Sequence, residues 1–189
     1  MTSENPFQSA PADGVTRLIF VRHAQTDANA KHYLQGQSDG VLNAVGKAQA
    51  ANIAGYLRTF FIDKVYSSNQ KRAVATATAI ADEHGLSVQT DVRLQEWNCG
   101  DWDGMPAAEF LQMAREQGLK ASTLQPPNGE TFQQVRSRAV AVLAEILDES
   151  EGKSVLICSH GDFIRSSIGI LMGIEADVVT NFLLDIASY

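Results

Sequence analysis

Short, uninterrupted runs of apolar residues alternate along this chain with longer segments in which apolar residues recur every three or four positions. Two of the runs, Leu18–Val21 and Val155–Cys158, are rich in branched residues, which is typical of strands buried on both faces. Residues 63–68 and 86–94 are two further strand candidates. We therefore expect a largely parallel sheet, because strands covered on both faces belong mainly to such sheets.

The segments between these runs have the spacing of amphipathic helices. Within residues 42–61, the apolar positions that share one helix face are Ala50, Ile53, Leu57 and Phe60. Residues 70–85 are rich in alanine and end at Gly85, a typical C-terminal helix cap. Two later helix faces consist of Phe132, Val135, Ala139, Val142 and Ile146, and of Ile164, Ile168 and Leu171.

This alternation runs from about residue 16 to the end of the chain without an internal repeat or a linker. It predicts a single α/β domain over residues 16–189, a three-layer sandwich with a mostly parallel central sheet and helices on both faces. Residues 1–15 are expected to form a flexible polar tail. Residues 105–130 are expected to form a cap-like insert with a helix after Pro106, and residues 96–104 a loop.

Composition narrows the classes of partner. The 189 residues include 22 acidic residues against 15 Lys and Arg, a formal net charge of -7, which argues against broad nucleic-acid binding. No apolar stretch is long enough to cross a bilayer, and the N-terminus lacks the pattern of a secretory signal. Two cysteines make no disulfide framework. We expect a cytoplasmic protein that binds neither membranes nor nucleic acid.

Two histidines, His23 and His160, follow the ends of the two buried runs. Ligands of parallel sheets bind beyond the carboxyl ends of the strands, where both imidazoles would lie. Arg22 precedes the first histidine, and Arg72 lies in the first turn of a predicted helix. Guanidinium groups bind phosphate oxygens through paired donors. The two histidines and two arginines together therefore predict chemistry on a phosphate. Each of the four residues alone could equally be explained by packing or by solvation.

The histidines suggest two roles. A neutral imidazole at His23 could attack phosphorus if its other nitrogen is held as a donor. A protonated His160 could stabilise charge on the transferring group. The leaving oxygen also needs a proton donor, and three acidic residues lie in the loop at 96–104, namely Glu96, Asp101 and Asp103. Spacing alone does not choose among them.

Several ordered motifs resemble those of the histidine phosphatase superfamily, which has the phosphoglycerate mutase-like fold. The first is Arg22-His23-Ala24-Gln25-Thr26 with Asn29 following, where the usual form is RHGET followed by Asn. The others are Gln35-Gly36, Asp39, Leu42-Asn43, Gly46, Gln49-Ala50, Ser67-Ser68, Arg72-Ala73, Thr76-Ala77, Leu94 to Gly104, Asn128-Gly129-Glu130-Thr131 and Ser159-His160-Gly161. The resemblance covers the chain from about residue 16 to about residue 181.

The resemblance implies a role for each matching residue. His23 would be the nucleophile that becomes phosphohistidine, and Glu96 would be the proton donor. The residues that would bind the substrate are Arg22, Asn29, Gln35, Gly36, Arg72, His160 and Gly161. The resemblance implies that the reaction needs neither a metal nor another cofactor. It also implies a small phosphorylated substrate as the partner, and it is compatible with a homodimer.

The resemblance favours the phosphatase branch. Mutases of the family carry a sequence like ERHYG at the acid, whereas Glu96 is followed here by Trp97-Asn98-Cys99-Gly100. The insert at 105–130 is also larger than the reduced lid of phosphohistidine protein phosphatases. We therefore expect a metal-independent phosphomonoesterase that hydrolyses a small phosphorylated metabolite.

Other functions stay open at this stage. One is mutase-type phosphoryl transfer, and another is dephosphorylation of phosphohistidine in proteins. A third is a zinc site made of His23, His160 and a carboxylate, which the neighbouring arginines disfavour. The last is a phosphate-binding regulatory protein without turnover, for which Ala24 in place of the usual glycine is the hint.

Overall fold

One parallel sheet forms the centre of the protein. The computed structural model describes residues 5–120, 123, 125–180, 182 and 184–188. Its strands are β1 (Arg17–Arg22), β2 (Lys64–Ser68), β3 (Val88–Asp91) and β4 (Ser154–Ser159), in the order β1-β4-β2-β3. The two strands that precede the histidines are therefore neighbours, and their last residues, Arg22 and Ser159, lie side by side.

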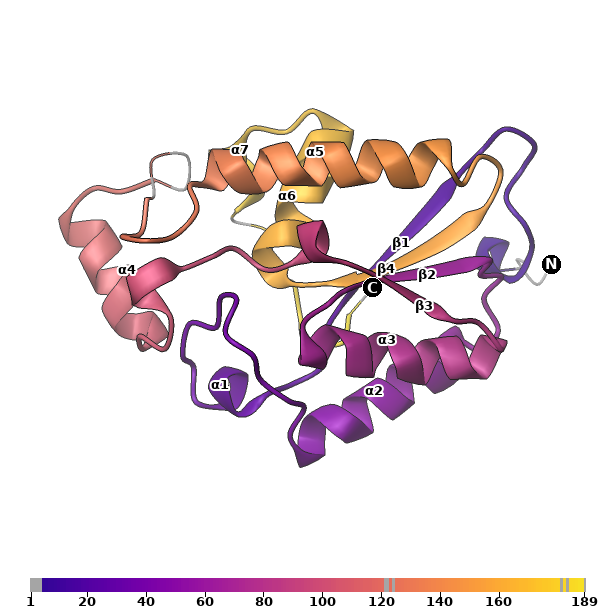
Figure 1. Ribbon diagram of the computed structural model, residues 1–189, viewed down its shortest axis with the longest axis horizontal. Helices are drawn as coiled ribbons and strands as arrows, with labels where there is room; N and C mark the ends of the chain where they lie inside the picture. Colours follow the sequence, from indigo (N-terminus) through magenta and orange to yellow (C-terminus); the bar gives the residue numbers. More distant parts are fainter. Residues whose placement is uncertain (1–4, 121–122, 124, 181, 183, 189) are drawn as a thin grey trace.

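Helices cover both faces of the sheet (Figure 1). On one face lie α2 (Ala44–Leu57) and α3 (Lys71–His84), and on the other α5 (Phe132–Asp148) and α6 (Gly161–Met172). Leu57, Ile80 and Val65 belong to the apolar core on the first side. Val142 and Ile157 belong to the core on the second. The predicted three-layer α/β architecture is confirmed.

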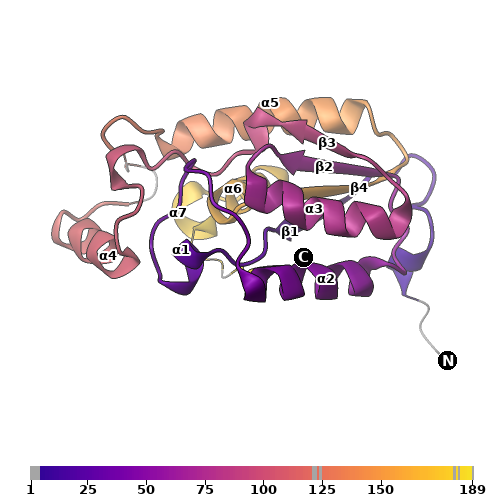
Figure 2. The ribbon, with the colours of Figure 1, turned by 60° about the horizontal axis from the view of Figure 1, so that its bottom comes forward.

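Three shorter helices complete the described part of the chain: α1 (Asp27–Ala30), α4 (Ala107–Glu116) and α7 (Ala176–Val179). Residues 6–8, 92–94 and 100–102 form 3-10 turns. Helices α1 and α4 lie at the same end of the molecule, outside the layers (Figure 2). Helix α4 is the helix predicted after Pro106. Among the described residues, no helix combines the length and the apolar character needed to cross a membrane.

Local hydrogen bonds explain where the helices begin and end. Helix α2 begins at Ala44 because the side chain of Asn43 accepts a bond from the backbone N–H of Gly46 (2.8 Å) and caps the helix there. It ends at Leu57, so Phe60, predicted on the same helix face, lies beyond the helix, although it is buried. Helix α3 ends where predicted, at Gly85, whose φ of 63° is a left-handed conformation that costs a glycine little.

Two predictions about elements need correction. The strand expected over residues 86–94 covers only Val88–Asp91, because the Asp91 side chain accepts a bond from the backbone of Arg93 (2.7 Å) and turns the chain into a 3-10 turn. In α6, Leu171 is 47 % exposed, so it does not share the buried face with Ile164.

The segment expected to be a polar tail contacts the body of the protein at Phe7. Its ring stacks on that of Phe60, with a centroid separation of 5.1 Å. The guanidinium of Arg17 also donates to the carbonyl oxygens of Pro6 and Ser9 (2.8 and 2.9 Å). Residues 6–9 are therefore held against the start of β1.

Candidate active site

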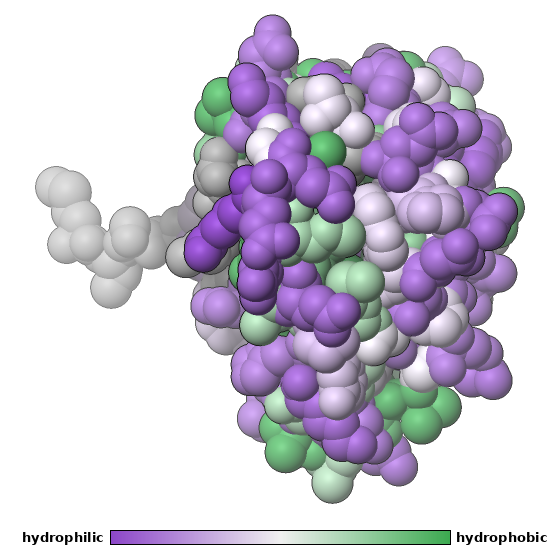
Figure 3. All heavy atoms as spheres, turned by 90° about the vertical axis from the view of Figure 1, so that its left-hand side faces the viewer, coloured by the Kyte–Doolittle hydropathy of each residue, from purple (hydrophilic) through white to green (hydrophobic). Residues whose placement is uncertain are grey.

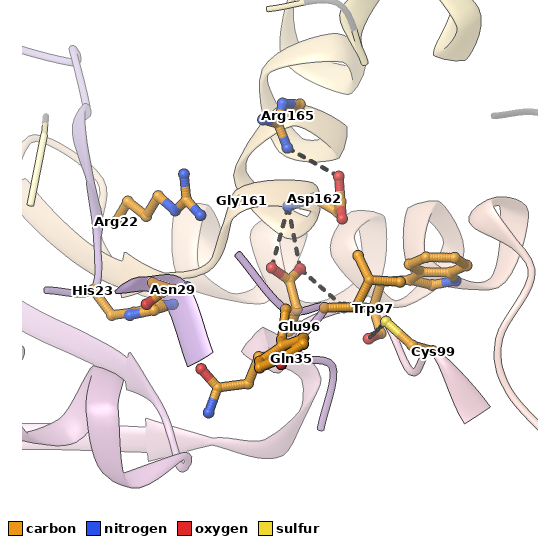
Figure 4. A pocket seen from close by; sticks show the side chains of 12 residues that line it. Arg22, His23, Asn29, Gln35, Glu96, Trp97, Cys99, Gly161, Asp162 and Arg165 are labelled. Carbon is orange, nitrogen blue, oxygen red and sulfur yellow. Dashed lines mark hydrogen bonds and ion pairs between the residues drawn. The ribbon is translucent and has the colours of Figure 1, made fainter. Parts of the chain in front are cut away.

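A cavity of about 130 Å³ lies beyond the carboxyl ends of β1 and β4 (Figure 4). It is lined by Arg22, His23, Asn29, Tyr33, Leu34, Gln35, Glu96, Trp97, Cys99, Gly161, Asp162 and Arg165. Two further residues, Arg72 and His160, are fully buried and lie next to His23, Arg72 at its Nε2 and His160 beside its ring. We call Arg22, His23, Arg72 and His160 the phosphoryl cluster, and Tyr33, Leu34, Trp97, Asp162 and Arg165 the outer wall.

His23 has one ring nitrogen fixed and the other directed at Arg72. Its Nδ1 lies 2.8 Å from the carbonyl oxygen of Ala24, a contact that requires the proton to be on Nδ1. Its Nε2 then accepts a bond from Nε of Arg72, at the longer distance of 3.3 Å. The imidazole is 3 % exposed and held in one tautomer, in which the unprotonated Nε2 carries the lone pair.

Arg72, in the first turn of α3, is held by two backbone carbonyls. Its Nη1 donates to Ser38 (2.9 Å) and its Nη2 to Gly36 (2.8 Å). A glycine is needed at position 36, since a Cβ there would lie 2.8 Å from the carbonyl oxygen of Trp97. A guanidinium has five N–H groups, so further donors remain for an anion after these contacts.

The phosphoryl cluster contains polar atoms that lack partners among the described residues. These atoms are Nε of Arg22 and both ring nitrogens of His160, all of them buried. The rings of His160 and His23 are 5.0 Å apart between centroids. Buried polar groups are normally hydrogen-bonded, so this arrangement fits the binding of an anion in front of His23.

Burial favours the neutral form of both imidazoles. It lowers the pKa of His23 to about 3, and the positive charge of Arg72 acts in the same direction. Burial likewise lowers the pKa of His160 well below its ordinary value, with His23 and Arg72 as further causes. A bound dianion would oppose these effects and favour protonation of His160.

Glu96 lies on the side of the cavity away from His23, and its carboxylate is directed at the start of α6 (Figure 4). Its Oε1 accepts bonds from the backbone N–H groups of Trp97 (2.9 Å), Asp162 (3.1 Å) and Phe163 (3.3 Å). Burial raises its pKa, and the neighbouring carboxylate of Asp162 raises it further. A carboxyl group with a raised pKa is suited to donate a proton.

The other two acidic residues of this loop lie outside the lining of the cavity. Asp101 is exposed and accepts from the side chain of Asn128 (3.1 Å). Asp103 binds the backbone of the loop at Gly36 and Ser38. Of the three candidates that spacing left open, the structure brings Glu96 alone to the cavity.

Four of the seven predicted substrate-binding residues, Arg22, Asn29, Gln35 and Gly161, line the cavity. The side-chain oxygen of Gln35 accepts from the hydroxyl of Thr26 (2.7 Å) and that of Asn29 from the backbone N–H of Thr26 (3.0 Å), which orients both side chains. Gly36 lies outside the lining, as do Arg72 and His160, and it holds Arg72 through its carbonyl oxygen.

Most residues of the outer wall were not predicted from the sequence. Asp162 and Arg165 form an ion pair (2.9 Å) on the first turn of α6. Their spacing of three residues, directly after His160 and Gly161, is a signal that could have identified them. Tyr33 and Leu34 follow no comparable pattern, because a loop after a one-turn helix positions them.

The methyl group of Ala24 does not block the site. Ala24 is fully buried and clusters with Leu42 and Ala50, and its backbone N–H donates to the Thr76 hydroxyl (3.0 Å). The substitution of alanine for the family's usual glycine is thus accommodated by the core.

The described part of the chain contains no group of three or more His, Cys, Asp and Glu side chains arranged to hold a metal ion. Around the cavity end of the molecule, hydrophilic side chains dominate the surface and apolar areas are small and separate (Figure 3). The site is therefore a small polar cavity rather than part of a broad apolar face.

Comparisons with known proteins agree with this geometry. The family model described as histidine phosphatase superfamily (branch 1) matches residues 18–189. Glucosyl-3-phosphoglycerate phosphatase of Mycolicibacterium vanbaalenii is 31% identical over 173 residues, which are 86% of this chain and 77% of that protein. Phosphoglycerate mutase-like protein 4 of Arabidopsis thaliana is 34% identical over 171 residues, covering 86% of this chain and 74% of that protein.

Solved structures are similar over nearly the whole chain. A mycobacterial glucosyl-3-phosphoglycerate phosphatase in complex with VO3 superposes with a TM-score of 0.82 at 29% identity, covering 91% of this chain and 88% of that one. A phosphoserine phosphatase of Entamoeba histolytica, in complex with 3-phosphoglyceric acid, gives a TM-score of 0.81 at 26% identity, covering 92% and 88%. The fold is thus shared with phosphoglycerate mutase-like phosphatases.

Proposed function

Because the chain belongs to the histidine phosphatase superfamily (branch 1), we propose that it hydrolyses a small phosphorylated metabolite through a phosphohistidine formed on His23. The observation that carries this proposal is the orientation of His23. Its Nδ1 faces a carbonyl oxygen at 2.8 Å, and its Nε2 faces the buried cations of the site. A nucleophilic nitrogen in a cationic pocket is what phosphoryl transfer to histidine needs.

In the first step, Nε2 of His23 attacks phosphorus and the bond from phosphorus to the alcohol oxygen breaks. Arg22, Arg72 and a protonated His160 bind the phosphoryl oxygens and stabilise the charge of the transition state. Glu96 gives its proton to the departing oxygen, so that a neutral alcohol leaves.

In the second step, the carboxylate of Glu96 takes a proton from water. The hydroxide equivalent attacks phosphorus, the bond to Nε2 breaks, and orthophosphate is released. Glu96 is then protonated again and His23 is neutral, which restores the starting state. The backbone N–H groups that hold Glu96 keep it in place for both proton transfers.

The proposal also includes three finer points. No metal takes part, since Arg22 and Arg72 repel a cation at the place where the phosphoryl group binds. The substrate is a small metabolite, which is supported by the names of similar proteins, a glucosyl-3-phosphoglycerate phosphatase and a phosphoserine phosphatase. The protein works in the cytoplasm and can form a homodimer.

Phosphate release from p-nitrophenyl phosphate by the purified protein, with and without a chelator, tests the proposed function. We expect release that is unaffected by the chelator and that falls to background in His23→Ala. A rate no higher than that background would contradict enzymatic turnover, and loss of activity with the chelator would favour the metal alternative.

A mutase remains the second candidate, because a relative that is 34% identical is named phosphoglycerate mutase-like. The two activities share the first chemical step and differ in the acceptor of the phosphoryl group. Incubation with 3-phosphoglycerate separates them: a phosphatase releases orthophosphate, whereas a mutase produces 2-phosphoglycerate.

A further inference from the structure

Asp103 lies outside the cavity, yet its carboxylate is connected to Arg72 through two layers of hydrogen bonds, and Arg72 contacts the nucleophile. We infer that Asp103 is a positioning residue that fixes the guanidinium of Arg72 for phosphoryl binding. This inference rests on the proposed function, because it concerns the same phosphoryl cluster.

The first layer joins Asp103 to the loop at residues 36–38. One carboxylate oxygen, Oδ1, accepts from the backbone N–H of Gly36 (3.2 Å) and the hydroxyl of Ser38 (3.0 Å). The other, Oδ2, accepts from the backbone N–H of Ser38 (3.1 Å). Three bonds to a single carboxylate hold this loop more firmly than a neutral side chain could.

The second layer joins the same two loop residues to Arg72. The carbonyl oxygens of Gly36 and Ser38 accept from its Nη2 and Nη1, at 2.8 and 2.9 Å. Gln70 adds a bond to the carbonyl of Gly36 (3.1 Å). The N–H groups of the loop therefore face Asp103 while its carbonyls face the guanidinium.

The third contact is the one to the nucleophile, from Nε of Arg72 to Nε2 of His23. A shift of the loop would tilt the guanidinium plane and change both this contact and the donors left for the phosphoryl group. The charge of Asp103 also supports Arg72. Burial lowers the pKa of Arg72, whereas the carboxylates of Glu96 and Asp103 oppose this effect and favour the charged guanidinium.

The loop is also bonded to the base of α4. Backbone bonds join Leu34 and Met105 (2.8 Å), and Gly104 and Leu34 (3.0 Å). Asp103 thus belongs to the segment that runs from Glu96 to the start of α4. Its carboxylate binds Gly36 and Ser38, the two residues whose carbonyl oxygens hold Arg72.

Asp103→Asn tests the inference with little change of shape. The amide keeps one oxygen but presents an N–H₂ group to a backbone N–H, so at least one of the three bonds is lost. We expect the inhibition constant of orthophosphate, measured against p-nitrophenyl phosphate, to rise about tenfold, the effect of weakening a bond to a charged group. The matched control is Asp101→Asn, an exposed acid two residues away, for which we expect less than a twofold change.

A double-mutant cycle separates positioning from general stability. Arg72→Lys keeps the charge but cannot bind both carbonyls, so in this background Asp103→Asn should raise the constant less than about twofold. A full tenfold rise in both backgrounds, or no rise in the wild type, would overturn the inference. If Asp103→Asn does not fold, Ser38→Ala should raise the constant two- to threefold, and an unchanged constant would then count against the inference.

The outcomes also separate this inference from the proposed function. A wild-type protein that neither hydrolyses the aryl phosphate nor binds orthophosphate would contradict the proposed function itself. An active wild type whose Asp103→Asn variant binds orthophosphate equally well would overturn only the role of Asp103.

Discussion

The phosphoryl cluster and the outer wall face each other across a small cavity, but they are built from different parts of the fold. Arg22, His23 and His160 stand at the ends of two neighbouring buried strands, and Arg72 stands at the start of a long helix. Tyr33 and Leu34 belong to a loop, and Tyr33 is 42 % exposed. In the proposed mechanism, the ends of β1 and β4 and the start of α3 therefore hold the groups that act on phosphorus, while a loop and the first residues of α6 contribute to the region around the group that leaves.

This difference has a consequence for substrates. Every phosphomonoester presents the same phosphoryl group, so a change in the phosphoryl cluster should affect all substrates alike. In the proposed mechanism the outer wall meets the variable part of the substrate, so a change there should affect substrates unequally. Glu96 would act between the two regions, on the oxygen that joins phosphorus to the variable part.

Substituting Glu96 should have the largest effect of the variants that retain the nucleophile. Glu96→Gln removes the proton donor, so hydrolysis of an alkyl phosphate should fall on the order of 10²–10⁴-fold. Hydrolysis of p-nitrophenyl phosphate should fall much less in its first step, since p-nitrophenolate leaves without a proton. Burst kinetics with both substrates measure this, with exposed Glu109→Gln as control; equal losses in the first step would refute proton donation by Glu96.

His160→Gln should lower kcat on the order of 10²–10³-fold, because one donor to the phosphoryl oxygens is lost. The loss should be the same for aryl and alkyl phosphates, in contrast to Glu96→Gln. Steady-state kinetics with both substrate classes measure the ratio. A ratio that changes more than a few-fold would place His160 on the leaving-group side and break the division between the two regions.

The buried histidines should also make stability depend on pH. The pKa of His23 is about 3 in the folded protein and 6.5 as its ordinary value, so the unfolded chain binds more protons between these values. Its contribution is present above pH 6.5 and is lost as pH falls. Between pH 7 and pH 4 the free energy of unfolding should drop by about 3 kcal/mol on account of this group.

Glu96 acts in the opposite direction, because its raised pKa favours the folded protein at low pH and this contribution is lost as pH rises. The comparison of the wild type with His23→Gln isolates the histidine. Denaturant unfolding at pH 7 and pH 4 should show a smaller drop in the variant. An equal drop in both proteins would mean that His23 is not buried as a neutral group.

Tyr33→Ala should have the smallest effect and the most selective one. We expect kcat/KM to change less than about tenfold for any substrate, since Tyr33 contributes binding rather than charge stabilisation. The order of preference among phosphorylated metabolites should change, while the inhibition constant of orthophosphate stays the same. A uniform loss for all substrates, or weaker orthophosphate binding, would assign Tyr33 to the phosphoryl cluster instead.

The same division explains how much of the protein could be predicted from its sequence. Buried strands have recognisable apolar runs, and the residues after them occupy fixed places, so the fold and the positions of His23 and His160 followed from the pattern. The short β3 did not, because a side-chain bond at Asp91 ends the strand within an apolar segment. The choice of Glu96 over Asp101 and Asp103 needed the family resemblance and then the three-dimensional arrangement, because loop conformation has no period.

The most direct test of the account is to locate the covalent intermediate. Glu96→Gln slows the second step, so after incubation with p-nitrophenyl phosphate and an alkaline quench, mass spectrometry should find a phosphoryl group on His23, in a form that acid removes. The same experiment with His23→Ala should find none. A phosphoryl group on another residue, or rapid turnover in His23→Ala, would contradict the assignment of His23 as the nucleophile.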